Sequence, residues 1–315
     1  MVVHDSPTVD YRPLTFGYSR GMRRITGPLL VLAGVFTFHA WGTLAWLSRN
    51  SLPDGLHNEF MHLWRAVELF FRIRDMGGEG THALLFEEYY PPLLPLVADL
   101  VLAVGPNHED TLAAANLVWL ALLLVATFAI GDRMAGPWTG ALAAALVSLY
   151  PFIFGSLRHL EPCVALTACS AAAIWALWAS RGFSRTGPTV AFGLAVAGGL
   201  LVDRLAMAPL MAAPAVAAGI EGWRAASPGA RRGVLLRMGL ASGLVVVLCA
   251  YYYGYFLAEH LAEISSQVEG EIDSHGVHTE DRSVLSLTFW TYYVLAWFDG
   301  QTGAVLGLAG LVALV

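Results

Sequence analysis

The chain places acidic and arginine side chains in short stretches at the ends of long apolar runs. One stretch, SLPDGLHNEF at 51–60, carries Asp54 and Glu59 directly after such a run. Another, SLRHLEP, carries Arg158 and Glu161 between two further runs. A positioned carboxylate can remove a proton or bind a divalent cation, and arginine binds phosphate oxygens through paired N–H donors. These stretches therefore predict a site for acid–base chemistry on a phosphate-bearing, lipid-linked substrate.

The segments that must position these residues have the composition of a membrane protein. Hydrophobic residues make up 57% of the 315 residues and charged residues 13%, with a mean hydropathy of +0.59, well above an ordinary soluble domain. Every basic residue is arginine, and the net charge of -6 argues against nucleic acid as a partner. The three cysteines lie in apolar runs, where we expect small buried hydrophobes without disulfide or thiol chemistry: Cys163, Cys169 and Cys249.

Apolar runs long enough, or nearly long enough, to cross a bilayer recur along the chain. The arginine-rich residues 1–26 precede the first run, which lacks a cleavage site, so they predict a cytoplasmic tail followed by a retained helix. Residues 27–315 are expected to form one transmembrane domain, cut off inside its last helix. The predicted runs are 28–47, 111–130, 138–157, 162–180, 188–202, 205–220, 237–257 and 301–315.

The run 91–105 decides the predicted topology. It contains three prolines near its start and Asp99, and it is shorter than the roughly 20 residues that a crossing helix needs. If it does not cross, the opposite inter-helix turns carry only Arg158 and Arg204. We therefore predict a helix in the outer interface, because the positive-inside rule then holds. The turns expected to face the cytoplasm carry Arg133, Arg181, Arg185, Arg224, Arg231, Arg232 and Arg237.

Residues 48–110 then form a long outward loop with two short helices, at about 55–73 and 93–104. The first has an apolar stripe expected to rest on the membrane, with a polar face opposite; an amphipathic spacer with a solvated polar face is the alternative. The stripe comprises Phe60, Leu63, Trp64, Val67, Phe70 and Phe71, and the polar face Glu59, Arg65 and Arg72.

This topology places most candidate residues on the outward side. A second outward loop, 258–300, adds acids together with His275 and His278, which could bind a metal ion; a solvated loop is the alternative. A divalent metal stays open as a cofactor, with Asp54 and Glu161 as further candidate ligands, and no other cofactor is expected. The outward residues near helix ends are Asp54, His57, Glu59, Glu87, Glu88, Arg158, His159, Glu161, Asp203 and Arg204.

Four stretches, in order over about residues 27 to 260, carry a resemblance to a known family. They are LPDGLHNEF, EEYYPPLLPL, GDRMAGPWTGALAAALVSLYPFIFGSLRHLEP and GLAVAGGLLVDRLAMAPL. Together they resemble the motifs of GT-C-type membrane glycosyltransferases that use polyprenyl-phosphate sugars. This group includes the family 39-like protein O-mannosyltransferases and lipid A aminoarabinose transferases.

The resemblance implies an all-α, polytopic membrane protein with a GT-C-like helical core and outward interfacial helices. It implies transfer of a sugar, usually with inversion, from a polyprenyl-phosphate-linked donor to a lipid, glycan or protein acceptor. The reaction would take place on the periplasmic side of a bacterial inner membrane, among membrane lipids.

The site residues that the resemblance implies begin with Asp54, which matches the first-loop aspartate, a base or an acidic site organiser. Glu161 takes the place of the second outward acid. The chain has Asp54-Gly55 where the family often has Asp-Glu, and Asp203-Arg204 where it often has Thr-Lys. Arg204 would then replace the lysine as a phosphate partner. The expected substrate-binding residues are Arg204, Arg158, Glu59, Glu88 and Tyr90.

Two other classes of function stay open. A multi-pass transporter or flippase would also place charges at helix ends, although coupling residues in transporters tend to lie near the bilayer midplane. A non-catalytic membrane scaffold would tolerate replacement of the outward acids without any effect. Neither the sugar nor the acceptor can be read from the sequence.

Overall fold

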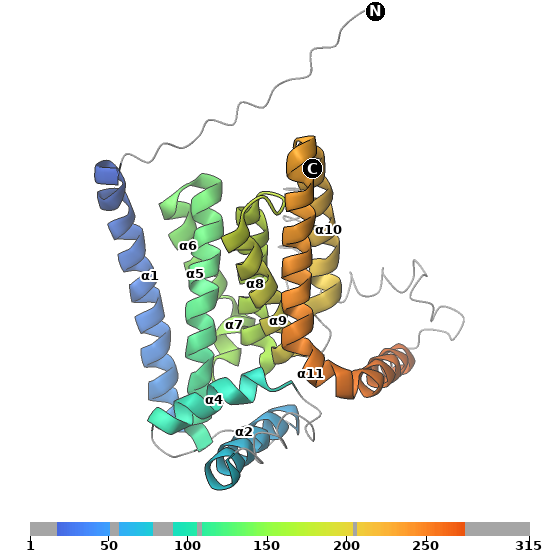
Figure 1. The fold of residues 1–315 in the computed structure, drawn as a ribbon. Helices are drawn as coiled ribbons and strands as arrows, with labels where there is room; N and C mark the ends of the chain where they lie inside the picture. Colours follow the sequence, from blue (N-terminus) through green and yellow to red (C-terminus); the bar gives the residue numbers. More distant parts are fainter. Residues whose placement is uncertain (1–17, 51–56, 78–90, 106–108, 204–206, 275–315) are drawn as a thin grey trace, which may run out of the picture.

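The computed structural model describes residues 18–50, 57–77, 91–105, 109–203 and 207–274, and these ranges form helices and turns without a strand (Figure 1). Long helices stand side by side as a bundle, and shorter helices lie across one end of it. The predicted all-α class is thus confirmed for this part of the chain. Within the described ranges, four segments are long and apolar enough to cross a membrane: Ile25–Leu47, Thr111–Ala135, Pro162–Ser180 and Pro228–Gly254.

The order of the helices agrees with most of the predicted runs. The bounds of α8 coincide with the prediction, because Pro162 occupies its first turn and Arg181 ends it in a left-handed conformation. The elements in chain order are α1 (Tyr18–Leu47), α2 (His57–Met76), α4 (Leu93–Val104), η1 (Glu109–Ala115), α5 (Asn116–Ala135), α6 (Pro137–Ser148), α7 (Pro151–Ser156), α8 (Pro162–Ser180), α9 (Thr186–Val202), α10 (Met207–Ala225) and α11 (Pro228–Ser274).

The predicted helix at 93–104 is confirmed as α4, which lies crosswise at one end of the bundle and packs against α2, η1 and α9. The predicted stripe of α2 divides between two environments. Leu63, Val67 and Phe70 pack against the core, whereas Trp64 and Phe71 are exposed. Packing against α4 therefore takes part of the surface that was predicted to rest on the membrane.

The predicted continuous run 138–157 is wrong, because the helix breaks at Leu149 and Tyr150. Pro151 has no backbone N–H and disfavours a helical conformation in the residue before it, and Tyr150 accordingly adopts φ -58° and ψ 129°. The 12 residues of α6 span only about 18 Å. Residues 151–156 form the separate short helix α7.

The helix α11 extends well past the predicted run 237–257. Its 47 residues continue to Ser274, through the first part of the segment predicted as a polar loop. Figure 1 shows that this helix bends away from the bundle near the end where α4 lies. The reason lies in the sequence: residues 258–274 include four glutamates and two alanines, which favour helix, and an apolar residue recurs at three- and four-residue steps, at Leu261, Ile264, Val268 and Ile272.

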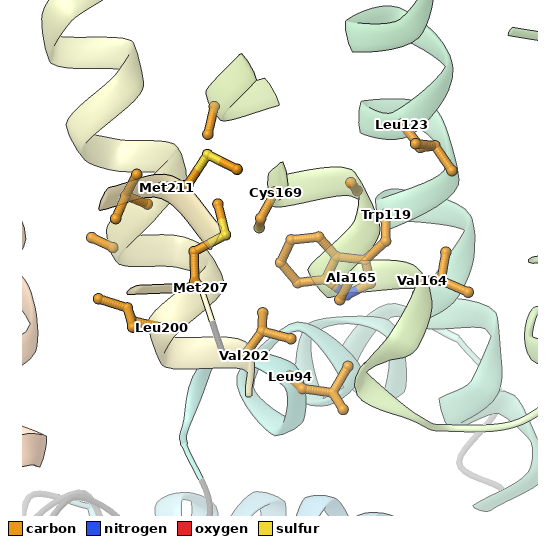
Figure 2. Close-up of a cluster of buried hydrophobic side chains, with 14 of the residues drawn as sticks. Leu94, Trp119, Leu123, Val164, Ala165, Cys169, Leu200, Val202, Met207 and Met211 are labelled. Atoms are coloured by element: carbon orange, nitrogen blue, oxygen red, sulfur yellow. The ribbon is translucent and has the colours of Figure 1, made fainter. Parts of the chain in front are cut away.

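The core lies where α5, α8 and α9 meet, and small side chains allow close helix packing there. On α8, Ala165, Ala168 and Ala173 are fully buried. Figure 2 shows the Trp119 ring of α5 facing Ala165, with Met207 of α10 nearby. This packing fixes the ends of α8 and α9, which carry the polar turns described below.

The bundle has two ends with different charged residues. The α4 end comprises α2, α4, the last residues of α1 and α9, and the first residues of α5 and α8; it carries Arg158, His159, Glu161 and Asp203. The opposite end, termed the arginine end, carries Arg133, Arg181, Arg185, Arg224, Arg231, Arg232 and Arg237. This grouping agrees with the predicted separation of the arginines, while the orientation in a membrane stays a prediction.

Candidate functional site

The turn between α7 and α8 carries Arg158, His159 and Glu161, and α5 holds this turn in place. Asn116, fully buried at the first position of α5, donates from Nδ2 to the carbonyl oxygens of Ser156 at 3.0 Å and His159 at 2.6 Å. Ser156 is the last residue of α7 and His159 lies in the turn after it, so the amide joins the start of α5 to the end of this short helix and to its turn. The buried amide therefore gives the polar turn one defined position.

Arg158 lies between two aromatic rings at the α4 end. Its Cζ atom is 5.1 Å from the ring centroid of Phe154 and 5.6 Å from that of Trp46, which comes from α1. The ring faces attract the cation and hold it in place. Among the described residues no carboxylate pairs with this guanidinium. Within the described ranges the cation is thus held by aromatic rings and not by an ion pair.

A small cavity of about 20 Å³ lies beside Arg158, and α1 contributes His39 and Thr43 to its wall. His39 is 2% exposed, and its Nε2 atom has no hydrogen-bond partner within the described ranges. His39 and Thr43 are four residues apart, so both lie on the helix face toward Arg158. The wall is completed by Phe38, Gly42, Phe154 and Leu157.

Two carboxylates lie close to the Cys163 thiol at the start of α8. Cys163 Sγ donates a weak hydrogen bond to Glu161 Oε2 at 3.9 Å, and both Glu161 and Asp203 are near enough to act electrostatically on the thiol. Glu161 is the N-cap residue of α8, yet its side chain makes no capping hydrogen bond. Asp203 directly follows α9, whose end is fixed because Tyr253 of α11 donates from its hydroxyl to Leu200 O at 2.7 Å.

A third carboxylate at this end is buried. Asp99 on α4 is 8% exposed, and neither of its oxygens has a hydrogen-bond partner in the part of the chain that the structure describes. Burial disfavours the charged form and raises the pKa of Asp99 to about 7. This carboxyl group therefore gains or loses its proton near neutral pH.

The structure brings together only part of the predicted site. It places Arg158 and Glu161 in one turn, whereas Asp54, Glu88, Tyr90, Arg204, His275 and His278 lie outside the described residues. Glu59 lies in α2, but its side chain is not described. In the described ranges no group of three or more His, Cys, Asp or Glu side chains is placed to hold a metal ion.

Several residues of the site were missed in the sequence. Cys169 and Cys249 are buried as predicted, but Cys163 is only half-buried and contacts Glu161. The proximity of Asp203 to Cys163 depends on the packing of α8 against α9, which no local pattern shows. His39 did leave a signal, because a histidine and a threonine four residues apart are unusual in a run otherwise suited to a membrane.

Together these groups could bind a phosphate and accept a proton at one end of the bundle. Arg158 supplies paired N–H donors, and Glu161 in the same turn and Asp203 after α9 supply carboxylates at this end. Compared with known proteins, the chain matches no family model, no curated protein and no solved structure. Support for a function therefore comes from the site itself.

Proposed function

We propose that the chain is a membrane glycosyltransferase that moves a sugar from a polyprenyl-phosphate donor to an acceptor hydroxyl at the α4 end. One observation carries the proposal: the Arg158 guanidinium, held between two rings and without a carboxylate partner among the described residues, lies in the same turn as Glu161. A phosphate site beside a carboxylate suits transfer from a lipid phosphate to a hydroxyl group. The order of the sequence motifs adds the resemblance to GT-C enzymes.

The proposed reaction is a single displacement. A carboxylate removes the acceptor's hydroxyl proton, the acceptor oxygen bonds to the anomeric carbon, and the bond from that carbon to the phosphate oxygen breaks. Polyprenyl phosphate leaves with the bonding electron pair, and Arg158 stabilises the charge that develops on its phosphate. We assign the base to Asp54 and a supporting role to Glu161. Further substrate contacts are assigned to Arg204, Glu59, Glu88 and Tyr90.

The short helices supply a reason for a lipid donor. Trp64 is 56% exposed and Phe71 38% exposed on α2, which lies crosswise at the same end as Arg158. Exposed aromatic side chains on a crosswise helix favour a position at a membrane surface, where the phosphate of a long-chain lipid lies. Arg158 and the phosphate of the lipid donor would then lie at the same depth relative to the membrane surface.

The proposal can be tested with the full chain reconstituted in nanodiscs with a polyprenyl-phosphate sugar. Arg158→Ala should raise the KM for the donor about tenfold or more, since a charge-assisted contact is lost. Arg158→Lys should retain part of the affinity, because it keeps the charge without the paired donors. Arg232→Ala, which removes an exposed charge at the arginine end, is the matched control and should leave the KM unchanged.

Two results would overturn this assignment. Release of polyprenyl phosphate that is equal in the Arg158→Ala and Arg232→Ala proteins would remove Arg158 from the site. Absence of any release, in an otherwise folded protein tested with several sugar donors, would count against the glycosyltransferase itself. Mass spectrometry of lipid-linked sugars and surface glycans, with and without the protein, would identify the sugar.

A transporter or flippase is the second candidate, and one observation favours it. His39 is a buried titratable side chain inside a helix suited to cross a membrane, and such residues often serve ion or proton coupling. Proteoliposomes distinguish the two classes, because a transporter moves the lipid-linked sugar across the bilayer intact. A glycosyltransferase releases polyprenyl phosphate and gives a new glycoside.

A further inference from the structure

Three arginines converge at the arginine end, opposite the proposed sugar-transfer site. Arg133 lies in the last turn of α5, Arg181 directly follows α8, and Arg185 directly precedes α9; all three are exposed. Arg133 lies within electrostatic reach of both other arginines, and its Cζ atom is 5.0 Å from the ring centroid of Trp178. Within the described ranges none of the three forms an ion pair with a carboxylate.

The turn that carries Arg181 is strained and tightly packed. Arg181, Gly182 and Phe183 have φ values of 51°, 63° and 60°, a conformation that costs free energy for the two residues with side chains. Gly182 packs so closely on α10 that a Cβ atom there would lie 2.6 Å from Gly222 Cα. The Phe183 N–H donates to Ser180 Oγ at 3.1 Å, and the Phe183 side chain is buried. This packing fixes the turn.

Like charges that are held together by a rigid turn repel one another, and an anion bound between them relieves this repulsion. The position of the cluster indicates where that anion comes from. Arg133 is near the end of the segment Thr111–Ala135, which is suited to cross a membrane, and Trp138 and Trp178 are exposed at the same end. Tryptophan side chains favour the membrane interface, where lipid headgroups lie.

We propose that Arg133, Arg181 and Arg185 bind the phosphate of an anionic phospholipid headgroup in the leaflet at the arginine end. Arginine suits this ligand because its planar group donates paired hydrogen bonds to phosphate oxygens. The site is independent of the glycosyltransferase proposal, since it lies at the opposite end of the bundle. It would anchor the ends of α5, α8 and α9 to one lipid.

The test uses the purified full chain in a neutral detergent, titrated with phosphatidylglycerol in mixed micelles while thermal unfolding is followed. The double variant Arg181→Gln/Arg185→Gln should weaken the apparent affinity about tenfold, because two guanidinium groups proposed to contact the phosphate are lost. The matched control Arg224→Gln/Arg232→Gln removes two exposed charges at the same end and should change it less than about twofold. Arg181→Lys/Arg185→Lys, which keeps both charges without the paired donors, should retain part of the affinity and show that the turn still folds.

Titrations with three other compounds show whether the bound phosphate belongs to an anionic lipid. Phosphatidylcholine, inorganic phosphate and water-soluble glycerophosphoglycerol should give no comparable stabilisation. Equal weakening in the two Gln double variants would show diffuse surface attraction and overturn the site. Stabilisation by inorganic phosphate or the soluble headgroup that matches the lipid would overturn the lipid as its ligand.

Discussion

The two ends of the bundle carry polar side chains in different ways. At the arginine end the charges are mostly exposed and mostly of one sign, seven arginines against Asp132 and Glu221, and tight backbone packing supplies the rigidity. At the α4 end the signs are mixed. The buried histidine and acidic side chains of the described residues, His39, His62 and Asp99, all belong to elements that meet at or near this end. Because buried ionisable groups are costly, they support our proposal that the substrate binds at this end.

The largest effect expected at the α4 end is a pH dependence of stability from Asp99. Its pKa is raised from 3.8 to about 7 in the folded chain, so the folded state binds the proton more tightly than the unfolded state. The stabilisation that the folded chain gains from its tighter binding of the Asp99 proton is fully present below about pH 4. It declines as the pH rises toward 7 and is lost above 7. The difference corresponds to roughly 4 kcal/mol.

Asp99→Asn removes this dependence and should stabilise the protein at pH 8 but not at pH 4.5. Thermal unfolding in detergent at several pH values measures the difference between the variant and the parent. Asp75→Asn is the control, because Asp75 is exposed and pairs with Arg74 at 2.8 Å. If the stability difference between Asp99→Asn and the parent stays constant with pH, the Asp99 carboxyl group is hydrated or paired. The α4 end would then not contain a buried carboxyl group with a raised pKa.

The second effect concerns catalysis at the α4 end. Asp54→Asn should lower sugar transfer at least about a hundredfold while folding and insertion are retained, because asparagine serves as a helix cap but not as a base. Glu221→Gln at the arginine end is the matched control and should leave the rate unchanged. Near-normal transfer by a well-folded Asp54→Asn protein would reduce Asp54 to a cap and point to Glu59 or Glu161.

The smallest effect is expected from two variants of buried polar residues, one at each end. Comparing them distinguishes a loss of stability from a loss of donor binding. Asn116→Leu removes two hydrogen bonds to the turn at the α4 end, and Ser180→Ala removes those of the turn at the arginine end. Each change should cost about 1–3 kcal/mol of stability. Only Asn116→Leu should also raise the donor KM, because it releases Arg158. An equal KM for both variants would show that the turn at the α4 end does not contact the donor.

The parts of the fold that local signals determine were predictable. The length of the apolar run that begins at Pro162 predicts α8. The run 91–105 is too short to cross a membrane, and this predicts a separate short helix there. Proline also explains one failure, since Pro151 was present in the predicted run 138–157 but was outweighed by the count of apolar residues. The extension of α11 to Ser274 was not predicted, because the polar composition of this segment indicates a loop. The helix propensity of its residues is the better guide here.

The candidate site was predictable only where its residues are neighbours in sequence. Arg158 and Glu161 share one turn, so their association follows from the chain itself. The approach of Asp203 to Cys163 and the contact between Arg158 and Trp46 depend on how α1, α8 and α9 pack. Such contacts join residues far apart in sequence, and a single sequence contains no local pattern that specifies them.

The central claim, that the α4 end binds a polyprenyl-phosphate donor, is tested most directly by photolabelling. A polyprenyl-phosphate analogue with a photoreactive group next to the phosphate would be irradiated with the full chain, and the labelled peptides identified by mass spectrometry. If the donor binds at the α4 end, residues 154–163 should be labelled. Unlabelled polyprenyl phosphate should compete with this labelling, and the Arg158→Ala change should reduce it. Competed labelling of residues 181–185 instead, or labelling of 154–163 that neither competition nor Arg158→Ala reduces, would contradict this claim.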